Sequence, residues 1–284
     1  MFMRLGVALT LGLVLAPAIA GGIVSVRKQI EASMVLTGTI EIDASGQVVD
    51  YQLDQPDKVD PGALQVLRGS VAHWRFEPVI RDGRAVPARS RMSARLVARK
   101  RDDGNFQAMV TDADFPGMPE PGAVAITGKN LVRPAFPDRP LRDGVSAMAY
   151  VVVKVGANGL VEEAAVEQIN LAGVANESKM ASWRESFANA SLKAARASTF
   201  TMPTAGEQLG QSMAVRIPYA YQIDGGVLID KSYGQWVAYV PGPRQPVPWL
   251  LGVHAGSPDL VAANSLQPLG TQPGLRLLSP LGNG

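Results

Sequence analysis

The most regular hydrophobic pattern of the chain lies in its second half. Residues 149–155 form an apolar run rich in valine that predicts a strand, and a glycine-containing break at 156–159 leads into an extended pattern over 160–169. Residues 180–197 then follow a helical period, and apolar residues occupy every second position from Met213 to Tyr221. The predicted order is strand, tight turn, strand, helix, strand.

The same order of patterns occurs earlier in the chain. Residues 34–43 and 47–53 are predicted as two strands joined by a glycine turn, and Asp60 followed by Pro61 is typical of a helix start. A ragged third strand is predicted over 86–97. We therefore predict an α+β fold with two small units, each an antiparallel three-stranded sheet with a helix packed on one face.

These patterns divide the chain into segments. Residues 22–100 and 125–223 hold the two units, and a linker rich in Gly, Pro and Asp is predicted over 101–124. Residues 224–284, where Pro and Gly recur without a period, are predicted to form a mostly irregular tail. Within that tail, Trp249 and the two leucines after it are apolar enough to dock on the folded part.

The N-terminal residues predict export. Residues 1–20 have a short positive start, an apolar stretch and a small-x-small ending at Ala20, which is typical of a secretory signal peptide. A membrane anchor over residues 5–26 is the alternative, because this stretch carries no charge. Several glycines and Pro17 interrupt it, which favours cleavage. We expect a periplasmic protein, or alternatively one anchored in the inner membrane and facing the periplasm.

Composition narrows the range of functions. The 284 residues are 46% hydrophobic and 18% charged, which is typical of a folded protein. The formal net charge is +2 and the basic residues are scattered, so nucleic-acid binding is not expected. The absence of cysteine excludes disulfides, thiolate nucleophiles and cysteine metal sites.

No catalytic or cofactor motif occurs in the sequence. His73 and His254 are the only histidines, and there is no Gly-x-Ser-x-Gly motif, phosphate-binding loop or dinucleotide fingerprint. Glu162 and Glu163 are adjacent in a predicted strand, so they are expected to point to opposite faces. The aspartates of the predicted linker lack EF-hand spacing. We predict a protein that is not an enzyme and holds no cofactor or metal.

The order of elements resembles the C-terminal domain of the TonB family of energy transducers. The second copy has a Pro-x-aromatic-Pro element at 134–137, a glycine-containing lead-in at 142–145, a valine-rich strand and an Asn-Gly turn at 158–159. The first copy matches the middle of the pattern, including an aromatic-rich element that ends in proline at 74–78. The resemblance covers about 170 residues in two copies.

The resemblance implies a protein-binding role. In the family, the domain accepts an extended peptide at a sheet edge, where main-chain hydrogen bonds give affinity. The strand from Met213 to Tyr221 would be that edge, because Pro218 removes a ladder donor and proline is tolerated mainly at edges. The candidate partner-binding residues are Pro134, Phe136, Pro137, Met213, Val215, Arg216, Ile217 and Tyr219.

For these side chains the simpler interpretation is structural. The alternating apolar residues of the last strand are expected to face the core, so the functional prediction concerns the backbone edge. Phe136 is expected to act as a packed plug over the sheet rather than as a docking surface. Arg216, between two apolar positions, is predicted to be exposed.

The expected partners are envelope or outer-membrane proteins, including a TonB-dependent receptor. Pairing of two copies into a homodimer is a further candidate, and two linked units would suit bivalent binding. The family's transducers have a long Pro-rich spacer, and no such segment lies between Ala20 and Met34. A structural or assembly protein of the envelope, without a role in energy transduction, therefore stays open as the alternative function.

Overall fold

The computed structural model describes residues 30–100, 105–118, 125–204, 209–223, 233–250, 255–261, 265–270 and 274–281. The predicted leader and the alternative anchor lie outside these ranges. Within them, no helix is both long enough and apolar enough to cross a membrane.

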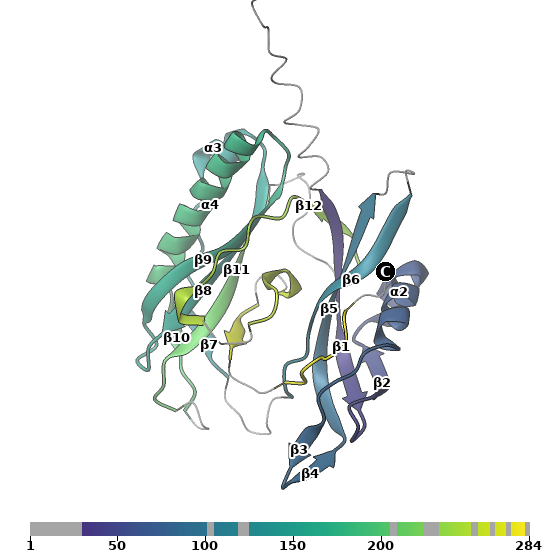
Figure 1. Cartoon of the computed structure of the whole chain (residues 1–284). Helices are drawn as coiled ribbons and strands as arrows, with labels where there is room; N and C mark the ends of the chain where they lie inside the picture. The colour runs from purple at the N-terminus through teal and green to yellow at the C-terminus, as the bar shows by residue number, and fades with distance from the viewer. Residues whose placement is uncertain are drawn as a thin grey trace, which may run out of the picture.

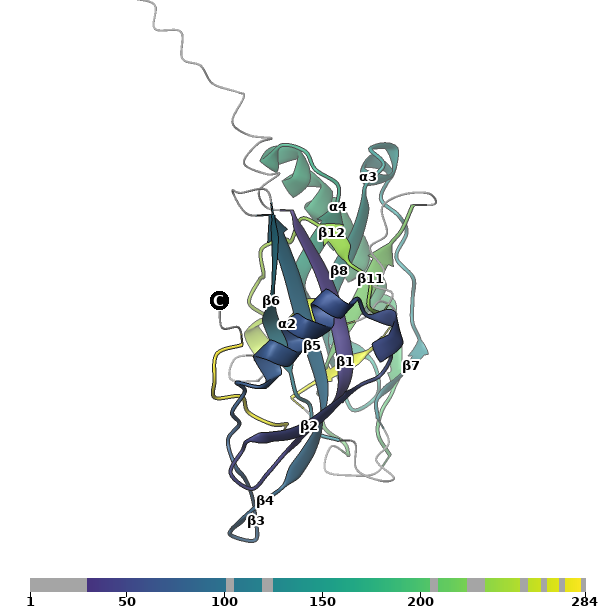
Figure 2. The ribbon, with the colours of Figure 1, turned by 90° about the vertical axis from the view of Figure 1, so that its right-hand side faces the viewer.

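Two antiparallel sheets face each other, and each carries a helix on its outer side (Figure 1). Helix α2 (Pro61–Val71) covers the first sheet and helix α4 (Glu177–Ala197) covers the second. Figure 2 shows α2 lying across the outer face of the first sheet. Part of the C-terminal chain lies in the space between the two sheets, so the molecule has a middle layer that is mostly irregular.

The first sheet has five strands, in the order β12-β1-β5-β6, and β2 also pairs with β1. These strands are β1 (Glu31–Ile42), β2 (Val48–Leu53), β5 (Ala88–Lys100), β6 (Phe106–Asp114) and β12 (Val237–Tyr239). A 3-10 turn (Pro56–Lys58) and a hairpin of β3 (Val79–Arg81) and β4 (Arg84–Val86) complete this half.

Alternation of side chains explains how this sheet buries its outer face. Apolar residues at alternate positions along most of β1 and the middle of β5 pack under α2. The members of this set are Met34, Leu36, Ile40, Ile42, Met92, Ala94 and Leu96. The predicted helix start is confirmed, because the Asp60 side chain accepts a hydrogen bond of 2.9 Å from the backbone N–H of Ala63. The rings of Phe76 and Phe115 complete this core. They pack edge to face, with their centroids 4.8 Å apart.

The second sheet has four strands, in the order β13-β11-β8-β9. They are β8 (Ser146–Val155), β9 (Val161–Ala172), β11 (Met213–Tyr221) and β13 (Gln267–Leu269). Short α3 (Asp138–Arg142) and a pair of strands, β7 (Thr127–Asn130) and β10 (Thr199–Thr201), flank it. Strand β8 is buried on both faces, since α4 covers one and the C-terminal chain the other. This double burial explains its uninterrupted apolar sequence.

The C-terminal chain pairs with the backbone of both sheets. Strand β12 continues the first sheet beside β1, and Val240 then exchanges two hydrogen bonds with Leu171 of β9. After the 3-10 turns Pro248–Leu250 and Pro258–Leu260, strand β13 joins β11. The last described residues return to the first half, where Leu277 bridges Phe76.

The predicted fold class is wrong. The main sheets have five and four strands rather than three each, and two small two-stranded sheets accompany them. Strand β6 lies in the segment that we predicted as a linker (101–124), and β12 and β13 lie in the predicted tail (224–284). The short strands β12 and β13 have three residues each, too few to show a period of two. A bulge at Thr111 interrupts the alternation of β6.

The expected docking of the tail is confirmed for Trp249 and Leu250, which pack against β8 and its neighbours.

A glycine lets the C-terminal chain approach β9 closely. A Cβ added at Gly242 would lie 2.1 Å from the carbonyl oxygen of Ile169. We expect Gly242→Ala to lower the free energy of unfolding by about 1–3 kcal/mol, because backbone must move to relieve the clash. Urea denaturation measures the change.

Gly69→Ala is the matched control. Gly69 lies within α2 and a Cβ there meets nothing within 4 Å. This substitution should raise the free energy of unfolding by about 0.5–1 kcal/mol through helix propensity. Equal effects of the two substitutions would contradict the close contact.

Candidate functional site

Strand β11 is not the free edge that the sequence predicts. It lies between β8 and β13 in the sheet order, and β13 pairs with Ala214, Val215 and Arg216. The expected core role of its alternate side chains is confirmed, because they pack against α4. These residues are Met213, Val215, Ile217, Tyr219 and Tyr221.

The predicted exposure of Arg216 is wrong, because its side chain is fully buried. Its Nε and Nη2 donate to the Glu167 carboxylate at 2.6 and 3.0 Å, and Nη1 donates to the side chain of Gln267 on β13. Burial of a guanidinium requires such a partner. The sequence gives no sign of it, since Glu167 is 49 residues away.

The Pro-x-aromatic-Pro element packs as a plug, as its structural interpretation predicted. The ring of Phe136 meets those of Phe187 on α4 and Tyr221 on β11 edge to face, at 5.7 and 5.5 Å. Pro134 is half-buried, and the half-buried Pro137 immediately precedes α3. Burial raises the pKa of Tyr221 to about 12, so its hydroxyl is neutral where it contacts Ser191.

Apart from the three-residue strands β12 and β13 at the sheet ends, four outer stretches of the main sheets pair with no strand that the structure describes. They are β2 (Val48–Leu53) and residues 106–113, 161–166 and 217–221 of β6, β9 and β11. The other parts of β9 and β11 are occupied by the C-terminal chain: Gln245 donates to Glu167 and Val240 bridges Leu171 on β9, and β13 covers β11.

Three of these edges carry features that oppose pairing with another chain. Strand β9 presents exposed Glu162 and Glu163, β11 has Pro218, and β2 has Asp50 and a bulge beside it. Both glutamates reach Lys154 Nζ at 3.4 Å, so their predicted separation onto opposite faces is wrong at this bulged strand end. Because Glu162 and Glu163 both form exposed ion pairs with Lys154, we do not interpret them as a pair of catalytic carboxylates.

Strand β6 has the least protected edge. From Phe106 to Val110 it contains no proline, glycine or charged residue, and it pairs in regular register with β5. The Phe106 side chain is 69% exposed. The first feature along β6 that opposes strand pairing is the bulge at Thr111. Leu275 of the C-terminal chain donates a hydrogen bond to the Phe115 carbonyl, which lies beyond the stretch from Phe106 to Val110. An unpaired strand of this kind is a template for strand addition.

A buried polar network joins the two sheets behind these edges. Arg95 of β5 donates to Glu31 and Asp112 at 2.9 and 3.0 Å and to the Tyr239 hydroxyl at 2.7 Å. Asp259 lies 3.8 Å from the same guanidinium. Burial by itself would lower the pKa of Arg95, but Asp259, Tyr239 and Asp112 raise it above its usual value. Burial and Asp259 raise the pKa of Tyr239, which keeps its hydroxyl protonated.

The Asp259 carboxylate continues this network into the second sheet. It accepts hydrogen bonds from Asn170 and Gln168 of β9, at 2.5 and 3.3 Å. Tyr150 of β8 is also fully buried on this side, and burial raises the pKa of its phenol well above the usual value. Sequence reasoning missed these residues, because a single Arg in a strand rich in Arg and Ser has no distinguishing pattern.

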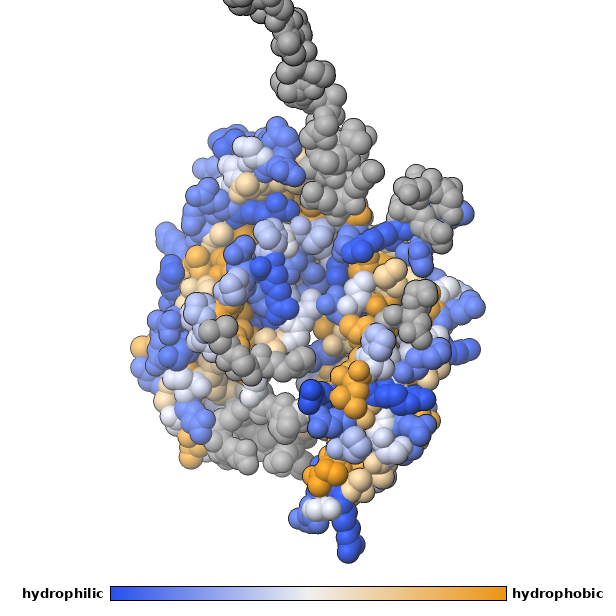
Figure 3. Space-filling model, in the orientation of Figure 1, coloured by the Kyte–Doolittle hydropathy of each residue, from blue (hydrophilic) through white to orange (hydrophobic). Residues whose placement is uncertain are grey.

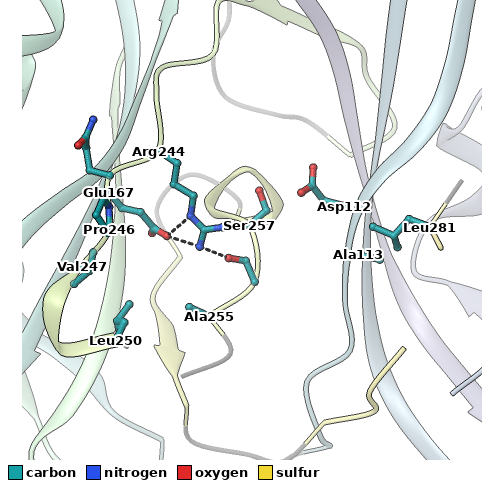
Figure 4. Close-up of a pocket in the computed structure, with 12 residues that line it drawn as sticks. Asp112, Ala113, Glu167, Arg244, Pro246, Val247, Leu250, Ala255, Ser257 and Leu281 are labelled. Atoms are coloured by element: carbon teal, nitrogen blue, oxygen red, sulfur yellow. Dashed lines mark hydrogen bonds and ion pairs between the residues drawn. The ribbon is translucent and has the colours of Figure 1, made fainter. Parts of the chain in front are cut away.

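A cleft of about 650 Å³ opens beside this network, between the sheets. Its walls come from β6 (Asp112, Ala113), β9 (Glu167), residues 244–247 and residues 255–257. Figure 4 shows Asp112 on one side and Arg244 on the other, with Ser257 between them. On the face seen in Figure 3, the surface is hollowed between the two halves of the molecule.

No metal-ligand cluster forms around this cleft from the described residues. Nowhere in that part of the chain do three or more His, Cys, Asp or Glu side chains gather as metal ligands would. His73 contacts the Gly69 carbonyl at 2.8 Å, away from the cleft, and His254, the other histidine of the sequence, lies outside the described ranges.

No known protein family model matches this chain, and no curated protein or solved structure matches it either. The resemblance to the TonB C-terminal domain therefore stays a prediction from the order of the sequence elements. The assignment of a function depends on the geometry of the edges and of the cleft.

The buried ion pair gives a test of the second sheet. Arg216→Met should lower the free energy of unfolding by about 3–5 kcal/mol, because Glu167 stays buried with one charged partner fewer. The double variant Glu167→Leu/Arg216→Met should lose less than the two single losses added together. Chemical denaturation of the wild type, the single variants Glu167→Leu and Arg216→Met and the double variant measures this coupling. Additive losses would contradict a direct interaction.

Proposed function

We propose that the protein is a protein-binding component of the bacterial envelope. It accepts an extended segment of an envelope or outer-membrane protein as an added strand on β6. The observation that carries this proposal is the edge of β6 from Phe106 to Val110, which pairs with no described strand and contains no proline, glycine or charged residue. A TonB-dependent receptor is one partner of this class, and the signal-peptide pattern supports a periplasmic location.

The edge of β6 offers both parts of strand recognition. Its outward N–H and C=O groups supply main-chain hydrogen bonds. Alternation then places one set of partner side chains beside the apolar row of Phe106, Ala108 and Val110. The other set would lie beside Gln107 and Met109, on the side that faces the second sheet. A partner segment with apolar residues at every second position fits this surface.

The alternative is an assembly protein of the envelope. The observation that favours it is the C-terminal chain, which pairs with both sheets and fixes one to the other. Such a rigid body suits a scaffold that holds a partner in place. Both functions use the β6 edge. They differ in whether binding of the partner is part of energy transduction.

Site-specific photo-crosslinking tests the proposal in the native bacterium. A photoreactive residue at Gln107, on the open edge, should crosslink to an envelope protein. The matched position is Val49 on β2, which is also exposed and on an edge. Equal crosslinking from both positions would contradict a specific site at β6. Crosslinks only between copies of the chain would replace the proposal with a homodimer.

Proline substitution separates the edge from the fold. Consecutive residues of a strand direct their N–H groups to opposite edges. Of Ala108→Pro and Met109→Pro, one therefore removes an outward donor and the other removes a bond to β5. We expect one variant to keep its thermal midpoint and lose most of the Gln107 crosslink. Ile80→Ser, at an exposed residue of the β3–β4 hairpin, should leave the crosslink unchanged.

A further inference from the structure

The cleft between the sheets has features of a small-molecule site that are independent of strand addition. Its volume of about 650 Å³ lies within the range of pockets that enclose small ligands. Both sheets and the C-terminal chain contribute to its walls, so the cleft exists only in the assembled molecule. Such pockets combine an apolar lining with a few polar groups that orient the ligand.

One wall of the cleft is positively charged. The Glu167 carboxylate is shared by two guanidinium groups, those of Arg216 and Arg244. Glu167 and Arg216 are buried, whereas half of the Arg244 side chain is exposed. Arg244 donates through Nε and Nη2 to Glu167 and through Nη2 to the Gly256 carbonyl. Among the described residues none accepts from its Nη1, which leaves this donor for a ligand carboxylate.

The facing wall is acidic. Arg95 stands against three carboxylates, Glu31, Asp112 and Asp259, and Arg99 pairs with Glu31, the same carboxylate that Arg95 contacts. Asp112 lines the cleft, and its Oδ2 accepts from Arg95 and Thr111. No residue in the described ranges donates to its other oxygen, Oδ1. A ligand ammonium group can therefore bind there without displacing Arg95.

Apolar side chains and one hydroxyl complete the lining of the cleft. The apolar members are Ala113, Pro246, Val247, Leu250, Ala255 and Leu281. Ser257 lies between Arg244 and Asp112 in Figure 4. The cationic and anionic groups thus lie on opposite sides of the cleft, and apolar residues contribute to both sides (Figure 4).

We propose that this cleft binds a zwitterionic ligand, a short peptide with free termini. The ligand's carboxylate binds at Arg244 and its ammonium group binds at Asp112, while its side chains contact the apolar lining. A ligand with one charge would leave one wall unmatched, and this requirement gives the site its selectivity. Because the ligand contacts elements of both sheets, its binding stabilises the assembled molecule.

Three forms of one dipeptide test the proposal by isothermal titration calorimetry on the full mature chain. Ala-Ala carries both charges, N-acetyl-Ala-Ala only the negative one, and Ala-Ala-amide only the positive one. Ala-Ala should bind at least about tenfold more tightly than either capped form. Equal binding of the three, or no heat with any of them at millimolar concentration, would overturn the proposal.

Two variants assign the charges to the walls. Asp112→Asn should remove the preference for Ala-Ala over its acetylated form, and Arg244→Gln should remove the preference over the amide. Arg276→Gln, which breaks an exposed ion pair with Glu77, is the matched control and should leave both preferences intact. A thermal melt of each variant establishes that it is folded. Unchanged preferences in folded Asp112→Asn and Arg244→Gln would also overturn the proposal.

Discussion

The buried carboxylate of Asp259 holds the two sheets and the C-terminal chain together. It lies between Arg95 of the first sheet and Asn170 and Gln168 of the second. A buried charge is costly unless it is paired and hydrogen-bonded, and only the assembled molecule supplies both kinds of partner. The arrangement of the sheets, and with it the cleft, therefore depends on this contact.

The same C-terminal chain determines which sheet edges are available to a partner. It adds β12 to β1, bridges β9 through Val240 and adds β13 to β11. Strand addition is thus already used within the molecule to cover edges that would otherwise be exposed. Within the described part of the chain, nothing of this kind covers the edge of β6 from Phe106 to Val110, and this stretch has no charge or proline such as those that protect the remaining stretches. This contrast is the physical basis of the proposed binding role.

The sequence predicted the local elements well and their assembly poorly. Alternation in β1 and β11, the Asp60 cap and the helical period of α4 were sufficient to place those elements. Strands of three residues carry no period, and a bulge hides the alternation of β6.

The buried polar residues were equally difficult to predict. Arg216 looked like the exposed residue of an alternating strand, because the sequence does not show that a second layer covers that face. On one wall of the cleft Arg95 pairs with Asp112, 17 positions away, and on the other Arg244 pairs with Glu167, 77 positions away. Pairing over such separations depends on the sheet order, which no local pattern reports.

Hydrogen exchange of the backbone amides, resolved by NMR on the protein alone, tests the central claim most directly. If the outer edge of β6 is open, every second amide from Phe106 to Val110 should exchange rapidly while its neighbours are protected. The Leu171 amide, which donates to Val240 at 3.1 Å, should exchange slowly. Uniform protection along β6 would show that another part of the chain covers this edge and would contradict the account.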